Sequence, residues 1–294
     1  MIQIAVDLLK KGEPVIFPTE TVYGLGAPLF NKEAINKIFT LKKRPKDNPL
    51  IVHVSSIEEA LSITKNCPPS FFRLAERFWP GPLSLVLLRG DRVPGIVSAG
   101  LATLAVRMPS HPIALQLIRE LGEPLVAPSA NLSGRPSPTK AEDAKEDLGG
   151  KVSCIIDGGE CSIGIESTVL NLSGSKPILL RPGTITKEEI EEVIQERVDV
   201  PEVGEVVLSP GMKYRHYAPK AKVCLVFSRD KLQGPFILSQ KPQRGERLLS
   251  PKTLYAEFRE ADRMGISQIE IDCDPQLFQN VALMNRLKKA ASHE

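Results

Sequence analysis

Short apolar runs alternate with stretches of helical periodicity through the first two-thirds of this chain, and this alternation limits its fold more than any other feature. Short apolar runs bounded by turn residues are typical of buried strands, and stretches with apolar residues at helical spacing predict helices. Such alternation predicts an α/β domain with a mixed sheet. We expect its strands at 15–18, 50–54, 83–88, 104–108, 125–127, 152–156, 168–172 and 178–180.

Helix starts are legible between these runs. Ser56, Thr139 and Thr186 each precede a glutamate at the spacing of a capping box, in which hydroxyl and carboxylate satisfy free backbone N–H groups. We assign residues 1–200 to the first domain and 201–219, with its proline-punctuated SPGMKYRHYAPK, to a linker. Residues 220–294 predict a small C-terminal α/β domain of Rossmann-like type, with strands at 223–227 and 267–271 and helices at 252–264 and 278–291.

The segment PTETVYGLG, residues 18–26, follows the first apolar run. It brings hydroxyls, a carboxylate and a phenol to the end of a strand and then opens into glycines. Short polar side chains supply directional hydrogen bonds, and glycine allows backbone to approach a ligand closely, so the segment is typical of a small-molecule site. A polar turn is the alternative.

A basic segment ends the helix expected at 31–43. Pro45 disfavours α geometry at Arg44, so the helix should end near Lys43, and Lys42 and Arg44 could then converge on one anion. A basic helix end that complements the dipole is the alternative. Asn48 and His53 follow along the next strand.

Polar side chains also follow the strand at 125–127. They are Ser129, Asn131, Ser133 and Ser137, set among prolines. Ligands bind at such strand ends in α/β folds, although a plain loop of this composition is common. No GxSxG elbow and no P-loop is present, so Ser129 is not interpreted as a nucleophile and any nucleotide must be held largely by side chains.

Two arginines lie in apolar strands, Arg107 in TLAVRMP and Arg181 in LLRPG. A charge in that position needs a partner, either a structural carboxylate or an anionic ligand held by the guanidinium fork. Together with Ser167 in GIEST, they favour an anion-binding cavity.

Composition excludes several classes of protein. Thirty-eight basic and 35 acidic residues leave a net charge of +3, too little to argue for a nucleic-acid partner. The five cysteines have no CxxC pair and no histidine at ligand spacing, so we expect free thiols in a reducing cytoplasm and no metal site in the protein. The N-terminus is interpreted as an amphipathic helix and not as a signal peptide, and no run is long enough to span a membrane.

Seven segments together closely resemble the YrdC-type threonylcarbamoyl-AMP synthases, in the long form with an additional C-terminal domain. They are PTETVYGLG, TLKKRPKDNPLIVHV (40–54), AVRMPSHP (105–112), VAPSANLSGRPSPT (126–139), GIESTV (164–169), LRPG (180–183) and SPGMKYRHYAP (209–219). The resemblance covers residues 1–220 and one further piece, ALMNRLKKAA at 282–291. It implies a YrdC-like twisted mixed sheet with helices in the first domain.

The resemblance also implies an activity. Members of this family are cytoplasmic nucleotidyltransferases that make threonylcarbamoyl-AMP and pyrophosphate from L-threonine, bicarbonate and ATP, with Mg²⁺ on the triphosphate. The product serves threonylcarbamoyl modification of a tRNA adenosine, so the implied partner is a downstream tRNA threonylcarbamoyl transferase. Direct contact with tRNA is left open, and no membrane is involved.

The resemblance assigns roles residue by residue. L-threonine would contact Thr21, His53, Arg107, Ala127 and Ser167. ATP would contact Arg44, Asn48, Thr103, Ser129, Ser137, Arg181, His216 and Tyr217. Lys42, Arg44, Ser129 and Asn131 would form the catalytic KxR and SxN elements, and the segment with Tyr214, His216 and Tyr217 would act as a lid.

Two other functions remain as alternatives. YrdC-like domains also resemble double-stranded-RNA binders, and Lys42, Lys43, Arg44 and Lys46 could form a phosphate patch for RNA or tRNA without synthase activity. A carbamoyl-adenylate module of the hydrogenase-maturation type normally adds zinc fingers and further domains, and this chain has neither the cysteine spacing nor the length.

Overall fold

The structure is a computed structural model that describes residues 1–201 and 216–292. Most of the predicted linker, including Tyr214, lies outside the described residues. Within the described ranges, no helix is long and apolar enough to cross a membrane.

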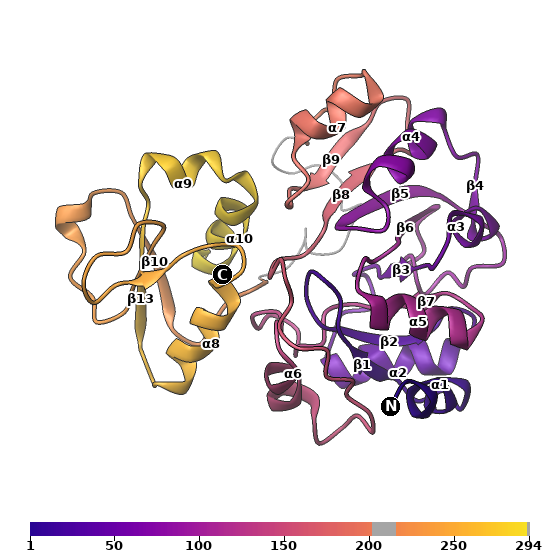
Figure 1. The fold of residues 1–294 in the computed structure, drawn as a ribbon, viewed down its shortest axis with the longest axis horizontal. Helices are drawn as coiled ribbons and strands as arrows, with labels where there is room; N and C mark the ends of the chain where they lie inside the picture. Colours follow the sequence, from indigo (N-terminus) through magenta and orange to yellow (C-terminus); the bar gives the residue numbers. More distant parts are fainter. Residues whose placement is uncertain (202–215, 293–294) are drawn as a thin grey trace.

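A mixed sheet of nine strands forms the large domain, as the sequence predicts (Figure 1). Its order is β1-β2-β7-β3-β6-β5-β8-β9, with β4 paired to β5; β3–β6 and β5–β8 are parallel and the other pairs are antiparallel. The strands are β1 (Val15–Phe17), β2 (Gly24–Pro28), β3 (Ile51–His53), β4 (Thr64–Lys65), β5 (Leu83–Arg89), β6 (Thr103–Arg107), β7 (Leu125–Val126), β8 (Thr168–Asn171) and β9 (Ile178–Arg181).

Helices cover both faces of this sheet, because successive side chains of a strand point to opposite faces. Val15 and Phe17 of β1 pack in one buried cluster with α1 and α5, whereas Ile16 packs in another with α2, α3, α4 and α7. The helices are α1 (Ile2–Lys10), α2 (Lys32–Lys42), α3 (Ile57–Ile63), α4 (Pro69–Phe78), α5 (Pro112–Leu121), α6 (Ala141–Leu148) and α7 (Lys187–Ile194).

The glycines of PTETVYGLG lie in strand β2, which the sequence did not predict. A Cβ on Gly26 would lie 2.7 Å from the Phe17 ring, and one on Gly24 would lie 3.3 Å from both Phe17 and Ala127. The strand therefore needs glycine to pass beneath a buried aromatic ring. The segment is a hairpin whose connection, residues 18–23, carries the polar side chains.

Of the other local predictions, some are confirmed and some are wrong. Residues 152–156 do not form a strand, because they meet the edge strand β1 only through a single bridge between Ile16 and Ile155. The capping box of Thr186 is present, and Ser56 caps α3 through its hydroxyl. Thr139 caps no helix: α6 starts after Lys140, which makes no side-chain cap.

The small C-terminal domain has a parallel sheet of order β10-β13-β11-β12, in agreement with the predicted α/β type. The predicted helix at 278–291 is divided, because Asn280 caps a new helix by accepting a hydrogen bond from the Leu283 N–H at 3.0 Å. The elements are β10 (Lys222–Val226), a 3-10 turn η1 (Arg229–Lys231), β11 (Ile237–Ser239), β12 (Arg247–Leu248), α8 (Leu254–Arg263), β13 (Gln268–Asp272), α9 (Pro275–Gln279) and α10 (Val281–Ala291).

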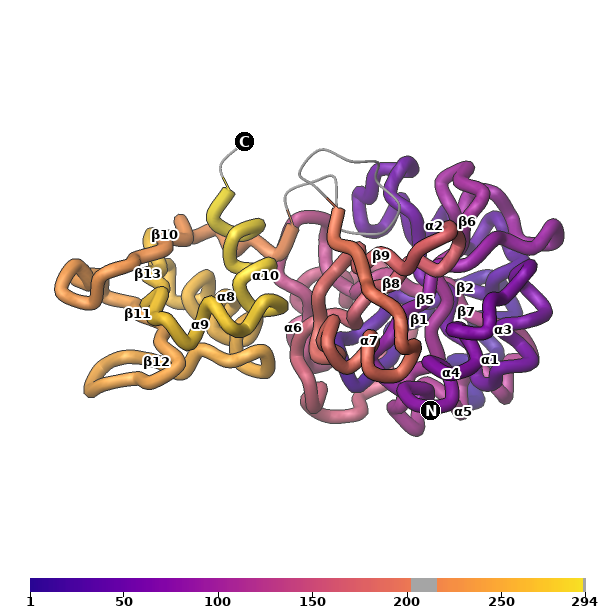
Figure 2. The backbone as a smooth tube through the Cα atoms, turned by 90° about the horizontal axis from the view of Figure 1, so that it is seen from above, coloured from indigo at the N-terminus to yellow at the C-terminus, as the bar shows by residue number. Residues whose placement is uncertain are grey.

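The domains share buried apolar surface. Figure 2 shows α8 and α10 between the small sheet and the large domain. Val22 and Ile165, from loops of the large domain, belong to the same hydrophobic cluster as Phe258 of α8 and Leu283 of α10. The small domain is therefore packed directly against the loops at one edge of the large sheet.

Gly183, in the loop after β9, lies very close to the backbone where the preceding loop enters β8. A Cβ at this position would lie 2.4 Å from the backbone nitrogen of Thr168 and 2.8 Å from the carbonyl carbon of Ser167. Backbone cannot yield as a flexible side chain can, so Gly183→Ala is expected to lower the free energy of unfolding by about 1–3 kcal/mol. Urea unfolding measures this change. Gly174→Ala is the control, since its nearest contact is 4.0 Å away; equal midpoints in the two variants would contradict the prediction.

Candidate active site

Strand ends and loops from distant parts of the chain meet around one pocket. The walls come from the β1–β2 connection, the segment leading into β3, the ends of β6 and β9, and the loops that follow β7 and precede β8. Most of the predicted site residues line it: Thr21, Arg44, His53, Arg107, Ala127, Ser129, Ser167, Arg181, His216 and Tyr217.

Arg107 lies at the end of β6 and is 4% exposed. Its guanidinium donates to the Gly81 carbonyl oxygen at 3.1 Å and to the Thr21 hydroxyl at 2.9 Å. A terminal nitrogen also forms an ion pair with Glu20 at 2.6 Å, although the two groups are not aligned for a hydrogen bond. The partner that the sequence required for Arg107 is therefore a structural carboxylate, which the sequence analysis had not assigned. A ligand carboxylate at Arg107 would share the guanidinium with Glu20.

Arg181 lies at the end of β9 and contacts Ser167. It donates to the Ser167 carbonyl oxygen at 3.0 Å and to the hydroxyl at 3.1 Å, and that hydroxyl also bonds to Ser84 at 2.8 Å. The predicted pair of Arg181 and Ser167 is thus brought together at the pocket wall.

Arg44 reaches the pocket from the residues after α2, which ends at Lys42 near the predicted position. Its side chain donates to the carbonyl oxygens of Asn48 at 3.2 Å and Pro49 at 2.8 Å. Burial, together with the charge of Arg181, lowers the pKa of Arg44 to about 10. Lowered affinity for a proton is the expected result of bringing two cations together away from water.

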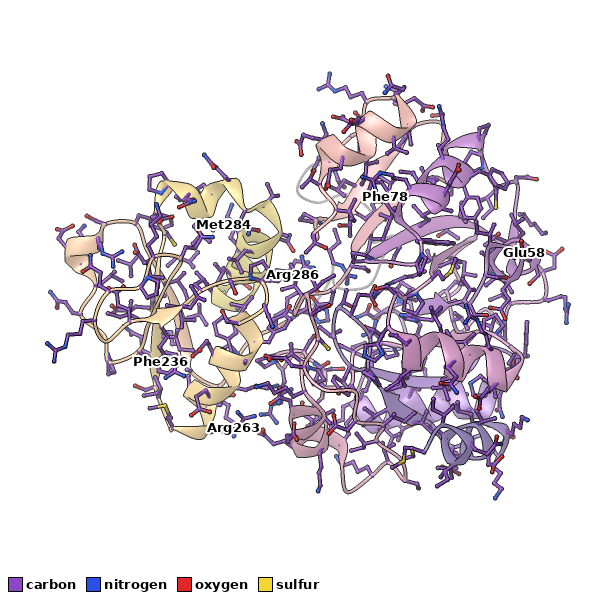
Figure 3. All side chains as sticks on the ribbon, viewed as in Figure 1. Glu58, Phe78, Phe236, Arg263, Met284 and Arg286 are labelled. Carbon is purple, nitrogen blue, oxygen red and sulfur yellow. The ribbon has the colours of Figure 1, made fainter. Side chains whose placement is uncertain are left out.

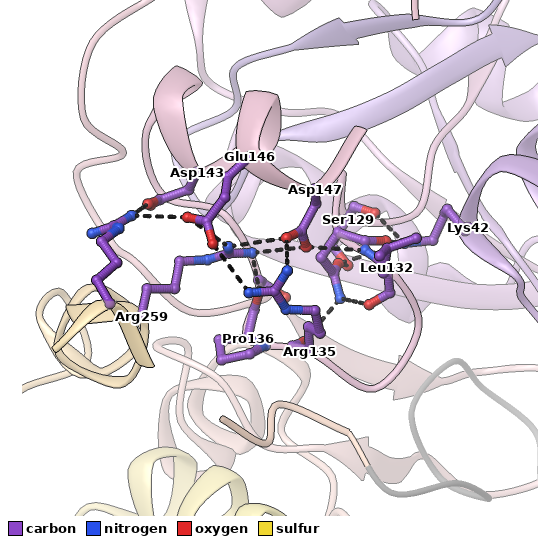
Figure 4. Close-up of polar contacts among 12 residues, drawn as sticks. Lys42, Ser129, Leu132, Arg135, Pro136, Asp143, Glu146, Asp147 and Arg259 are labelled. Atoms are coloured by element: carbon purple, nitrogen blue, oxygen red, sulfur yellow. Dashed lines mark hydrogen bonds and ion pairs between the residues drawn. The ribbon is translucent and has the colours of Figure 1, made fainter. Parts of the chain in front are cut away.

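Lys42 is buried and lies behind the pocket wall instead of lining it. Its ammonium donates to the Ser129 carbonyl oxygen at 2.5 Å and to the Asn131 carbonyl oxygen (Figure 4). Burial lowers its pKa well below the usual value, and Arg44 adds to this effect. Lys42 therefore ties α2 to the loop that carries Ser129 and Asn131.

The remaining predicted residues also lie outside the lining. Asn131 is buried and accepts a hydrogen bond from the Ser129 hydroxyl. Asn48 is buried, and its side-chain nitrogen has no hydrogen-bond partner. Thr103 begins β6 and pairs with Leu88, at the end of the strand opposite Arg107.

The basic segment does not form one exposed patch. Lys43 and Lys46 are exposed, but Lys42 is buried and Arg44 faces the pocket. An RNA-binding face needs cations that reach phosphates on the outside of the protein. This arrangement favours a small-molecule site over the RNA-binding alternative.

Glu166 is a pocket residue that the sequence analysis missed, although it stands in the quoted GIESTV. Its carboxylate accepts hydrogen bonds from Ser137 at 2.6 Å, from Tyr255 at 2.9 Å and from Arg286 at 3.0 Å. The predicted Ser137 thus touches the pocket through Glu166, and two of the donors belong to the small domain. Its position next to Ser167 in the sequence was the signal that could have identified it. A buried glutamate there requires hydrogen-bond donors.

His53 and His216 present neutral imidazoles to the pocket. Burial, with Arg107 nearby, lowers the pKa of His53 to about 3. Burial also lowers the pKa of His216 to about 4, and Arg44 adds to this effect. Nδ1 of His53 and Nε2 of His216 are buried without a hydrogen-bond partner.

The low pKa of His53 should be measurable as a pH dependence of stability. The unfolded chain takes up a proton near pH 6.5, but the folded chain does not until about pH 3. Stability is therefore complete above pH 6.5 and is lost as the pH falls towards 3, by up to about 1.4 kcal/mol per pH unit. His53→Gln should flatten the fall in unfolding free energy between pH 6.5 and 4, measured by urea denaturation. Equal slopes for the two proteins would contradict the burial of a neutral imidazole.

Comparison with known proteins agrees with this geometry. The family model Sua5_yciO_yrdC, described as Telomere recombination, matches residues 7–183. The model described as Threonylcarbamoyl-AMP synthase, C-terminal domain, matches residues 185–292.

Individual relatives match over the whole chain. A Pyrococcus abyssi protein named threonylcarbamoyl-AMP synthase is 43% identical over 320 residues, covering 99% of this chain and 94% of the relative. A Bacillus subtilis protein of the same name is 44% identical over 320 residues, covering 98% and 92%. The crystal structure of P. abyssi Sua5 complexed with L-threonine has a TM-score of 0.91 and 42% identity, covering 99% of this chain and 94% of that one. Because these matches extend over both domains, this chain belongs to the Sua5/YrdC family of threonylcarbamoyl-AMP synthases, in the long form with a C-terminal domain.

Proposed function

We propose that this enzyme forms L-threonylcarbamoyladenylate and pyrophosphate from L-threonine, bicarbonate and ATP. The observation that carries the proposal is the division of charge in the pocket. Arg107 donates to Thr21, whereas Arg44 and Arg181 are near enough for the charge of Arg181 to lower the pKa of Arg44; all four residues line the pocket. One small cavity thus offers a site for an amino-acid carboxylate and a separate cationic site for a polyphosphate.

The roles of individual residues follow from this division. We assign Thr21, His53, Arg107, Ala127 and Ser167 to L-threonine. Arg44, Ser129, Arg181, His216 and Tyr217 line the cavity and are assigned to ATP. Asn48, Thr103 and Ser137 remain assigned to ATP by resemblance alone, and each would act from outside the present lining.

The chemistry requires mainly positioning. The amine of threonine adds to bicarbonate or its CO₂ equivalent and gives a carbamate. A carbamate oxygen then attacks the α-phosphorus of ATP, and the bond from that phosphorus to the bridging oxygen of pyrophosphate breaks. The nucleophile belongs to the substrate, so the protein needs to align the reactants, neutralise charge and exclude water, which would destroy the carbamate and the mixed anhydride.

Mg²⁺ is expected to enter with the triphosphate. No group of three or more His, Cys, Asp and Glu side chains able to hold a metal occurs in the part of the chain that the structure describes. Glu20 and Glu166, the carboxylates beside the pocket, are engaged by Arg107 and Arg286. The metal would therefore neutralise phosphate charge as part of the substrate complex.

The proposal extends to the cell. We propose that the product passes to a tRNA threonylcarbamoyl transferase and that the enzyme works in the cytoplasm, consistent with five free cysteines. We also propose the division into a catalytic domain at 1–200, a linker and lid at 201–219 and a C-terminal domain at 220–294. His216 and Tyr217, at the end of that linker, line the pocket.

Product formation tests the function directly. Purified protein incubated with ATP, Mg²⁺, L-threonine and bicarbonate should yield threonylcarbamoyl-AMP, detected by mass spectrometry, together with one equivalent of pyrophosphate. Omission of threonine is the control and should abolish the product. Salt-sensitive RNA binding without product formation would instead support the RNA-binding alternative.

Substitutions in the basic segment test the pocket assignment. Lys42→Met removes the hydrogen bonds that hold the loop of Ser129 and Asn131, and Arg44→Met removes a cation from the pocket. Each substitution should therefore lower kcat/KM for ATP by about 100-fold. Pyrophosphate release measures the rate, and circular dichroism checks that each variant folds. Lys43→Asn is the matched control, because it removes an exposed neighbouring charge at a left-handed position that asparagine tolerates. A wild-type rate in both test variants would refute the assignment.

A further inference from the structure

Two arginines of the small domain, Arg259 of α8 and Arg286 of α10, are the largest of the fully buried side chains in the described chain. Figure 3 shows Arg286 at the junction of the two domains. A buried cation is stable only when partners satisfy its charge and its N–H groups. The hydrogen-bond partners of Arg259 belong to the large domain, and so do those of Arg286 apart from its neighbour Asn285.

Arg286 joins two loops at the pocket. Its Nε donates to the Glu166 carboxylate at 3.0 Å, and Nη2 donates to the Glu166 carbonyl oxygen at 3.1 Å. Nη1 donates to the Pro182 carbonyl oxygen at 2.6 Å. Glu166 directly precedes Ser167, and Pro182 directly follows Arg181, so a single side chain fixes the backbone beside two pocket residues.

The contacts of Arg286 continue towards the nucleotide side. The Glu166 carboxylate also accepts from Ser137, and from Tyr255 of the small domain. The ring of Tyr255 stacks on Tyr217 with centroids 5.7 Å apart, and the guanidinium of Arg286 lies 5.4 Å from the centre of the Tyr217 ring. Tyr217 lines the pocket but is held there by side chains of the small domain.

Arg259 holds a different loop. Its Nη2 donates to the Pro136 carbonyl oxygen at 2.6 Å and to Asp147 at 3.1 Å. Asp147 in turn accepts from the Leu132 N–H at 3.1 Å, as Figure 4 shows. The loop after β7, which presents Ser129, is therefore secured by Lys42 on one side and by Asp147 and Arg259 on the other.

We propose that the small domain positions the pocket for ATP through Arg286 and Arg259, which fix residues 128–138, 164–167 and 182–183; these segments are the pocket loops. The inference rests on the proposed function and assigns the small domain a part in it. Of the residues assigned to L-threonine, only Ser167 lies in a pocket loop, and Arg107 bonds to Thr21 and Gly81 inside the large domain. The threonine side is therefore expected to depend less on these contacts.

A purely structural role would predict something different. Arg263, also on α8, pairs across the same interface with Asp143 and Glu146 but touches none of the pocket loops, and its side chain is 44% exposed. If the arginines only held the domains together, a folded variant would bind both substrates normally. If they position the pocket loops, ATP affinity should fall in variants that remain folded.

The test is calorimetric titration of the full chain with Mg²⁺-ATP and, separately, with L-threonine. Arg286→Met is combined with Glu166→Gln, so that no buried charge is left unpaired, and Arg286→Lys and Arg259→Lys keep the charge. We expect the double variant to raise the Kd for ATP at least about tenfold, the two lysine variants to raise it less, and the Kd for threonine to change less than about threefold. Arg263→Met should change neither Kd. Thermal melting of each variant identifies those that fold.

The outcomes separate the two proposals. If the wild type binds no ATP, the proposed function fails. If the wild type binds ATP and the folded double variant binds it equally well, or if both substrates weaken to the same extent, the positioning role is overturned. A further measurement uses Ser137→Ala as the background. The Arg286→Lys change should then cost less ATP affinity than it does in the wild type, because part of its effect passes through Glu166 and Ser137.

Discussion

The buried carboxylate of Glu166 is the contact on which the pocket and the domain interface both depend. Burial favours its neutral form, but the charge of Arg286 and then that of Arg181 hold the pKa below its usual range. An ionised carboxylate accepts several hydrogen bonds at once, and here the donors come from two domains. The energetic requirement of one charged group thus dictates how loops separated by long stretches of sequence are placed.

Local signals explain why much of the fold is predictable from the sequence. The apolar run in β5 is long, and the hydroxyl and carboxylate of the Thr186 capping box act within one turn, so neither depends on distant residues. Strand β2 is different, because its glycines have little intrinsic strand preference. It forms a strand through pairing with β1 and β7 and through the space required by Phe17. The apolar run at 152–156 fails for the opposite reason: it has suitable composition but only a single bridge to β1.

The candidate site, like the fold, could be predicted from the sequence only in part. The chemistry of Arg107, Arg181 and Ser167 is evident from residue type and strand position, and the structure brings all three to one pocket. The ion pair of Arg107 with Glu20 and that of Arg286 with Glu166 could not be assigned, since ion pairing across a fold depends on tertiary distance. Lys42 illustrates the limit of motif reasoning. A lysine close to an arginine suggests a shared anion, whereas the observed ammonium donates to the backbone carbonyl oxygens of Ser129 and Asn131.

Buried charges are part of the interface where the two domains meet. Arg259, Arg286 and Glu166 are all nearly inaccessible to solvent, whereas the ion pair of Lys65 and Asp91 lies at the surface. Exposed pairs contribute little to stability, but an interior pair fixes geometry because either charge alone is costly. The interface therefore combines an apolar cluster with a small number of directional contacts.

Val22 and Ile165 give the shared apolar cluster a consequence for protein engineering. Each stands beside a residue of the pocket wall, Thr21 and Glu166 respectively, yet packs in the core of the other domain. A chimera that exchanged the C-terminal module between homologues would therefore need to transplant these hydrophobic anchors with it. The part that can be exchanged between homologues is therefore the C-terminal domain together with the residues of the large-domain loops that pack against it.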